Sequence, residues 1–136
     1  MDRPRFRASF LHPRFWLLWL GLGLLWLVVQ LPYRILLLLG RGLGAVMYRV
    51  ARSRRQIARR NLQLCFPELS EKERERLLRE NFVSTGIAFF EMAMSWWWPK
   101  SRLQRLAQIQ GLEHLQQAQA EGQGVILMTL HFTTLE

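Results

Sequence analysis

The sequence predicts an α/β protein with a transmembrane anchor helix, several α-helices, and then the first buried strand or strands. Three observations predict this order. An uncharged apolar run occupies residues 15–31, a helix-capping signal lies at Ser70, and a second apolar run at residues 125–132 has the length of a buried strand. We expect an anchor at residues 1–34, a basic helical region along the membrane surface at 35–69, and a further region at 70–136.

The predicted anchor is the run FWLLWLGLGLLWLVVQL, in which Gln30 is the one polar residue. Seventeen residues are at the short end of what crosses a bilayer, and the apolar side chains favour insertion by roughly 3 to 7 kcal/mol. Pro32 ends the helix. A buried core helix is the alternative, whereas a signal peptide is disfavoured because no A-x-A site follows. More arginines follow the run than precede it, which favours a single pass with the C-terminal part on the cytoplasmic face.

Positive charge is concentrated in the first 60 residues, which hold twelve arginines against one aspartate, whereas residues 61–136 are slightly acidic. The richest stretch is residues 52–60. It lacks the interleaved aromatic residues of many nucleic-acid sites, so anionic lipid headgroups are the nearer partner, and a solvated positive face is the alternative. Cys65 is the single cysteine, which excludes an internal disulfide. Gly40 and Gly44 have the spacing that permits close helix packing.

A long helix is predicted to begin after Ser70, because Ser70 and Glu73 form a capping box. Pro99 closes the segment. Three successive tryptophans before this proline point in different directions around a helix, so they indicate either contact with a membrane interface or packing inside a larger domain. The residues predicted to share one buried face of this helix are Leu78, Phe82, Thr85, Phe89, Met92 and Trp96.

The candidate catalytic residues, His131 and Glu136, come at the end of the predicted strand. Functional groups of parallel sheets collect at the carboxyl ends of strands, where His131 would lie. If a helix begins near Thr133, Glu136 can accept a hydrogen bond from the imidazole, which then offers its other nitrogen as a base. The alternative readings are a hydrogen-bonded core histidine and a capping box from Thr133 to Glu136.

The chain resembles the lauroyltransferases of lipid A biosynthesis, the late acyltransferases of Gram-negative bacteria. The resemblance runs through the whole chain and includes the family's H-x4-D/E dyad, which maps onto His131 and Glu136. The segments that carry it are HPRFW at residues 12–16, LVVQLPY at 27–33, RNLQLCFPE at 60–68 and LHFTTLE at 130–136.

The resemblance implies an α/β acyltransferase fold and transfer of a fatty acyl chain from acyl carrier protein to a hydroxyl of the Kdo-bearing lipid A precursor, at the bacterial inner membrane. It implies no cofactor and no metal ion. Residues 70–136 would then be the start of the acyltransferase domain, cut off after the dyad, and the fragment alone is expected to be inactive. A glycerol-phosphate-type acyltransferase and a non-catalytic membrane-anchored binding protein are the alternatives.

Overall fold

The computed structural model describes residues 8–107, 110–122, 124–126 and 128. Two short 3-10 helices precede α1, and four longer helices contain most of the remaining residues. The elements are η1 (Ala8–Leu11), η2 (Pro13–Phe15), α1 (Trp16–Val29), α2 (Tyr33–Val50), α3 (Arg52–Cys65), α4 (Glu71–Trp97), α5 (Lys100–Leu103) and α6 (Leu112–Ala120).

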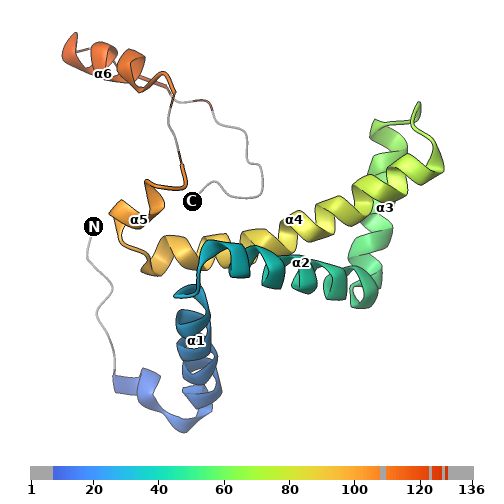
Figure 1. The fold of residues 1–136 in the computed structure, drawn as a ribbon, viewed down its shortest axis with the longest axis horizontal. Helices are drawn as coiled ribbons and strands as arrows, with labels where there is room; N and C mark the ends of the chain where they lie inside the picture. The colour runs from blue at the N-terminus through green and yellow to red at the C-terminus, as the bar shows by residue number, and fades with distance from the viewer. Residues whose placement is uncertain (1–7, 108–109, 123, 127, 129–136) are drawn as a thin grey trace.

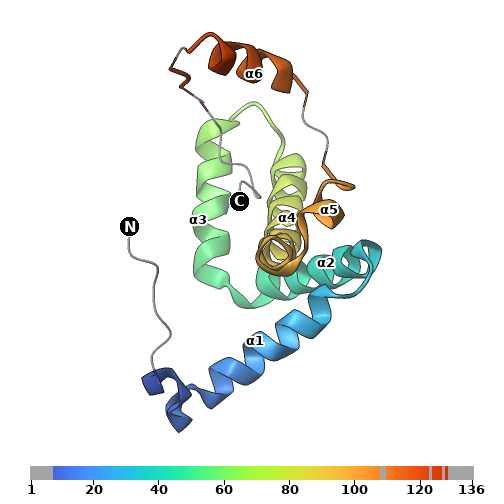
Figure 2. The same cartoon turned by 90° about the vertical axis from the view of Figure 1, so that its left-hand side faces the viewer.

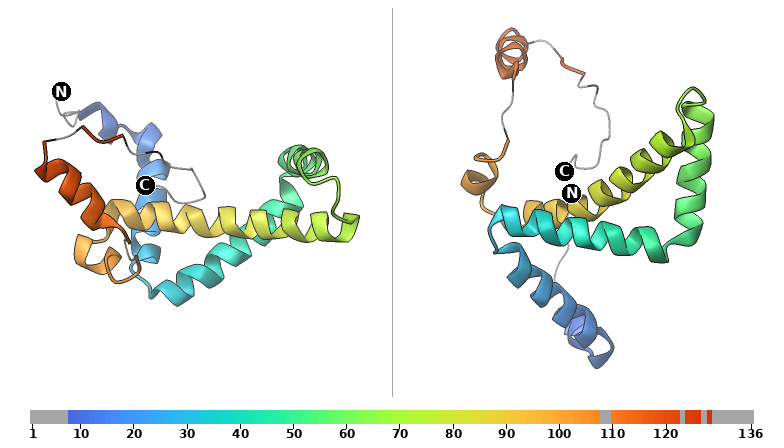
Figure 3. Two further views of the ribbon diagram at one scale, coloured as in Figure 1. Left: turned by 90° about the horizontal axis from the view of Figure 1, so that it is seen from above. Right: turned by 45° about the vertical axis from the view of Figure 1, so that its right-hand side comes forward.

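Helices α2, α3 and α4 form the three sides of a narrow triangle (Figure 3, right). Helix α4 returns alongside α2 in the opposite direction, and α3 spans the open end between them (Figure 1). Helix α1 projects from the closed end, where α2 begins, and α6 stands apart from the triangle (Figures 1 and 2). The principal helix contact of the described chain is therefore the one between α2 and α4.

Glycine allows α2 and α4 to approach so closely. A Cβ atom added to Gly86 of α4 would overlap the backbone oxygen of Gly40 and lie 2.5 Å from the nitrogen of Gly44, both in α2. A Cβ atom on Gly40 would lie 2.7 Å from the Cα of Ile87. Such distances leave no room for any side chain at these positions. The prediction that Gly40 and Gly44 permit close helix packing is confirmed, and Gly86 is the partner that the sequence analysis did not identify.

The apolar core lies at the closed end of the triangle, where α1, α2 and α4 meet. Trp98 donates a hydrogen bond from its indole nitrogen to the backbone oxygen of Val29 at 2.6 Å. Arg102 donates to the backbone oxygens of Gln30 and Leu31, at 3.2 Å each, and its guanidinium stacks on the Trp98 ring. These side chains satisfy carbonyls that a helix end leaves without intrahelical partners. The buried members of this core are Val29, Leu36, Ala93, Met94 and Trp98.

The capping box that opens α4 is confirmed. The Ser70 hydroxyl accepts from the backbone nitrogen of Glu73, and the Glu73 carboxylate accepts from the backbone nitrogen of Ser70. The predicted buried face of α4 is only partly right. Leu78 and Phe82 are buried, but Trp96 is 60% exposed.

The buried face of α4 continues through Gly86 and Ala93 instead of through the predicted positions. At about 100° per residue, these two positions lie roughly 60–80° around the helix from the predicted stripe. The reason is the glycine contact with α2, which a pattern of large apolar residues does not reveal. The three tryptophans therefore differ in burial: Trp98 is buried, Trp97 is partly buried and Trp96 is exposed.

The predicted transmembrane anchor is wrong. Helix α1 contains 14 residues and ends at Val29, because the chain turns at Gln30 and Leu31 before Pro32 starts α2. At 1.5 Å per residue it is about 21 Å long, shorter than the roughly 30 Å hydrocarbon core of a bilayer. Within the described ranges, no helix combines the length and the apolar character that a membrane span requires.

The predicted α/β fold is also wrong, because all regular secondary structure in the described residues is helical. A strand is stable only when a neighbouring strand pairs with its backbone, and the helices before residue 125 supply no such neighbour. Of the predicted strand at residues 125–132, the structure describes Val125, Ile126 and Met128, which are exposed and lie outside any helix or strand. The remaining residues of that run lie outside the described residues.

Candidate functional site

The two candidate catalytic residues, His131 and Glu136, lie outside the described residues. Their pairing in a dyad therefore stays a prediction. The described residues contain two other polar groupings, one at the open end of the triangle and one beside the core. In the described part of the chain, no three His, Cys, Asp or Glu side chains come together as a metal ion would require.

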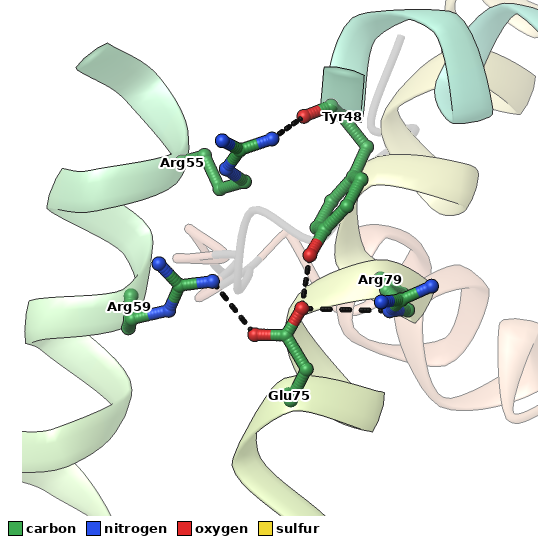
Figure 4. A network of polar contacts seen from close by, with 5 residues as sticks. All are labelled: Tyr48, Arg55, Arg59, Glu75 and Arg79. Carbon is green, nitrogen blue, oxygen red and sulfur yellow. Dashed lines mark hydrogen bonds and ion pairs between the residues drawn. The ribbon is translucent and has the colours of Figure 1, made fainter. Parts of the chain in front are cut away.

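The first grouping is a polar junction, formed by Tyr48 of α2, Arg55 and Arg59 of α3, and Glu75 and Arg79 of α4 (Figure 4). Glu75 is at its centre. One carboxylate oxygen accepts from the Tyr48 hydroxyl and faces the Arg79 Nε at 3.4 Å, and the other accepts from Arg59 Nη2 at 2.8 Å. One side chain of α4 thus holds both α2 and α3, which fixes the angle at which α3 spans the open end.

Two guanidinium groups also contact the Tyr48 ring. The Cζ atoms of Arg55 and Arg79 each lie 5.0 Å from the ring centroid, and Arg55 Nη1 donates to the backbone oxygen of Tyr48 at 2.5 Å. The hydrogen bond from Tyr48 is the main cause that lowers the pKa of Glu75, and Arg59 and Arg79 lower it further. The hydrogen bond between Arg59 and Glu75 raises the pKa of Arg59. The junction is therefore ionised at neutral pH, and its electrostatics stabilise the folded chain.

A pH dependence of stability follows from the lowered pKa of Glu75. A carboxyl group whose pKa is lower in the folded state contributes stability above its unfolded pKa, near 4.5, and loses it as the pH falls through the folded value. We expect Glu75→Gln to be less stable than the wild type at neutral pH, and the difference to shrink as the pH falls below about 4.5. Urea unfolding of both chains from pH 3 to 7 measures it.

The matched control is Glu80→Gln on the same helix. The Glu80 carboxylate pairs with Arg76 at 3.7 Å, and both side chains are well exposed, so the pair contributes little. The stability of Glu80→Gln should therefore follow that of the wild type over the whole pH range. If Glu75→Gln and Glu80→Gln had the same pH profile, the assigned role of Glu75 at the junction would be wrong.

The second grouping lies in a groove of about 670 Å³ between α2, α4 and the segment after α5. Tyr33 donates a hydrogen bond to Glu91 Oε1 at 2.6 Å. This bond, with burial and the nearby negative charge, raises the pKa of Tyr33 to about 12. The remaining walls are mostly apolar, with Leu43, Phe89 and Leu106 among them. The groove therefore offers one hydrogen-bonded pair in an apolar setting.

Neither grouping could be predicted from the sequence. Tyr33 and Glu91 are 58 residues apart, and Tyr48 and Glu75 are 27 apart, so no local spacing connects the members of either pair. Only the contact between Glu75 and Arg79 has a local signal, the i,i+4 spacing of opposite charges on a helix. The members of each pair come together because Gly40 and Gly44 of α2 pack against Gly86 of α4.

Comparison with known proteins gives consistent matches to acyltransferases. A sequence model described as bacterial lipid A biosynthesis acyltransferase matches residues 3–136. The chain is 48% identical over 133 residues to the lipid A biosynthesis lauroyltransferase of Escherichia coli strain K12, and 48% identical over 132 residues to the palmitoleoyltransferase of the same strain. A lipid A biosynthesis acyltransferase of Haemophilus influenzae is 42% identical over 135 residues. No solved structure gives a significant match.

These matches define the class of protein as acyltransferases. The chain belongs to the bacterial lipid A biosynthesis acyltransferase family. The alignments cover 98%, 97% and 98% of this chain but 44%, 43% and 43% of the three relatives, so the chain spans less than half of their length. The resemblance stated from the sequence is thereby confirmed at the level of the family.

Proposed function

We propose that the full-length protein is an O-acyltransferase of lipopolysaccharide biosynthesis that transfers a fatty acyl chain, lauroyl, from acyl carrier protein to a hydroxyl of the Kdo-lipid A precursor. The observation that carries this proposal is the 48% identity to the lipid A lauroyltransferase of Escherichia coli across 98% of the chain. The palmitoleoyltransferase of that strain is equally similar, so the acyl chain is the part of the proposal that most needs measurement.

In the proposed mechanism, His131 is the general base and Glu136 orients it. The imidazole takes the proton of the acceptor hydroxyl as the oxygen attacks the thioester carbonyl of the donor. A carbon–oxygen bond forms, the carbon–sulfur bond breaks, and the carrier leaves as a thiol that takes the proton from the imidazolium. The carboxylate stabilises the imidazolium while it exists. Neither a cofactor nor a metal ion takes part in these steps.

We also propose that the protein works at the cytoplasmic face of the bacterial inner membrane. The exposed apolar surface of α1 supports contact with lipid, since Trp16 is 64% exposed, Leu17 82% and Leu20 60%. An apolar surface of this extent favours a lipid interface over water. Exposed arginines on α3 would add attraction to anionic headgroups, and these are Arg52, Arg54 and Arg60.

The activity can be tested with the full-length protein in isolated membranes. Lauroyl, palmitoleoyl and myristoyl donors on acyl carrier protein are offered separately, each with the Kdo-bearing lipid A precursor or with glycerol 3-phosphate as acceptor. We expect the fastest transfer from the lauroyl donor to the lipid A precursor. Transfer to glycerol 3-phosphate instead would favour a glycerol-phosphate-type acyltransferase, and no transfer with any pair would favour a non-catalytic binding protein.

A further inference from the structure

An excess of positive charge surrounds the Tyr48 ring. Arg55 and Arg79 lie over the ring, Arg59 is bound to Glu75, and Arg49 lines a pocket together with Tyr48 and Arg79. The junction supplies one carboxylate for these four guanidinium groups. Like charges held close together repel unless an anion lies between them, so the cluster favours a further negative group.

The donors of this cluster are not exhausted by Glu75. Both carboxylate oxygens of Glu75 already accept hydrogen bonds, and Arg79 approaches it through Nε alone. The Arg49 side chain makes no hydrogen bond or ion pair with any residue that the structure describes. Since a guanidinium carries five N–H donors in a planar fork, Arg49 and Arg79 retain donors that can bind one more anion.

Both of these arginines line one pocket. It has a volume of about 390 Å³ and is lined by Ala45, Tyr48 and Arg49 of α2 and by Arg79 and Val83 of α4. Its walls combine guanidinium groups with an aromatic ring and small apolar side chains. This mixture suits a phosphate group attached to carbon, because forked donors match the phosphate oxygens and the apolar wall accepts the attached carbon.

We propose that this pocket binds a phosphate monoester, with Arg49 and Arg79 as the donors. The monoester can be the headgroup of an anionic lipid or a soluble phosphate, and the chemistry of recognition is the same. The residues that line the pocket all belong to α2 and α4, and the proposal does not depend on the proposed acyl transfer. Failure of the transfer assay would leave this proposal unaffected.

The test measures binding of the full chain to phosphatidylcholine vesicles that contain either phosphatidic acid, a monoester, or phosphatidylglycerol, a diester, at matched surface charge. The exposed apolar side chains of α1 favour any lipid surface, so the quantity of interest is the preference for phosphatidic acid over phosphatidylglycerol. We expect Arg49→Gln and Arg79→Gln each to reduce this preference by about fivefold, the factor expected for one arginine–phosphate contact.

Arg105→Gln is the matched control, because it removes one exposed positive charge away from the pocket and should leave the preference unchanged. Arg49→Gln is the decisive variant, since Arg49 has no partner among the described residues and its loss should not alter the thermal midpoint. Inorganic phosphate separates the two sources of ligand. Competition by millimolar phosphate would identify a soluble phosphate, and retention of the preference in its presence would identify the lipid headgroup.

The proposal would be overturned by equal binding of the wild type to the two vesicle types. It would also be overturned if the double variant of Arg49 and Arg79 kept the wild-type preference. A fall of the same size in Arg105→Gln would show that general surface charge, and not this pocket, causes the binding.

Discussion

Replacement of His131 by alanine in the full-length protein should lower the rate of acyl transfer by about 10²–10⁴-fold, the usual cost of losing a general base. Without the imidazole, the acceptor hydroxyl keeps its proton as it approaches the thioester, so the transition state is no longer stabilised. The measurement is the rate of transfer from acyl carrier protein to the lipid A precursor, with thermal stability recorded in parallel. A variant with the wild-type rate would remove His131 from the mechanism.

Replacement of Glu136 by glutamine separates two roles for that carboxylate. Glutamine keeps the size and the capping ability of the side chain, but it removes the charge that would stabilise an imidazolium. We expect a large loss of rate at unchanged stability, smaller than the loss in His131→Ala because the carboxylate only supports the base. Full activity at unchanged stability would make Glu136 a helix cap and would contradict the charged dyad.

The largest effect on stability is expected from Gly86→Ala. The added methyl group would overlap the backbone of Gly40 and Gly44, and backbone atoms of a packed helix cannot move aside as a flexible side chain can. Helices α2 and α4 must then separate along their whole contact. We expect a loss of about 3 kcal/mol in the free energy of unfolding, at the upper end of the usual cost of overpacking. Denaturant unfolding followed by helical circular dichroism measures it.

Gly42→Ala provides the matched control within α2. Gly42 is exposed, and a Cβ atom there would meet no atom within 4 Å. Alanine in a helix interior is favoured over glycine by roughly 0.5–1 kcal/mol, so this variant should be slightly more stable than the wild type. If Gly86→Ala were also stabilising, the close approach of α2 and α4 would not exist in solution.

Local signals in the sequence predicted the helix boundaries well. Pro32 lies between α1 and α2, Pro99 follows the end of α4, and the Ser70 capping box opens α4 as expected. Such signals act on the backbone of a few neighbouring residues and do not depend on the rest of the fold. They can therefore be read correctly even when the tertiary structure is unknown.

Features that depend on tertiary contacts were predicted less well. The apolar composition of residues 15–31 favoured a membrane span, but the turn at Gln30 shortens the helix below the required length. The buried stripe of α4 was displaced because glycine, which has no side chain to mark it as apolar, forms the closest contact. The junction at Glu75 joins three helices, and its partners cannot be found without knowing how those helices pack.

Local spacing was also insufficient to assign the candidate catalytic residues. Spacing alone left His131 and Glu136 open to a core histidine and a helix cap, and it was the resemblance over the whole chain that favoured a catalytic dyad. The comparisons confirm the family, and the two substitutions above test the catalytic roles of His131 and Glu136.

The hydrogen bonds that Trp98 and Arg102 donate to the backbone oxygens of Val29, Gln30 and Leu31 have a mechanical consequence. They tie the end of α1 and the turn that follows it to the C-cap of α4 and to α5. We therefore expect a change in the direction of α1 to act on the end of α4 and on α5. The surface that α1 contacts would then set the orientation of α2, α3 and α4 relative to that surface.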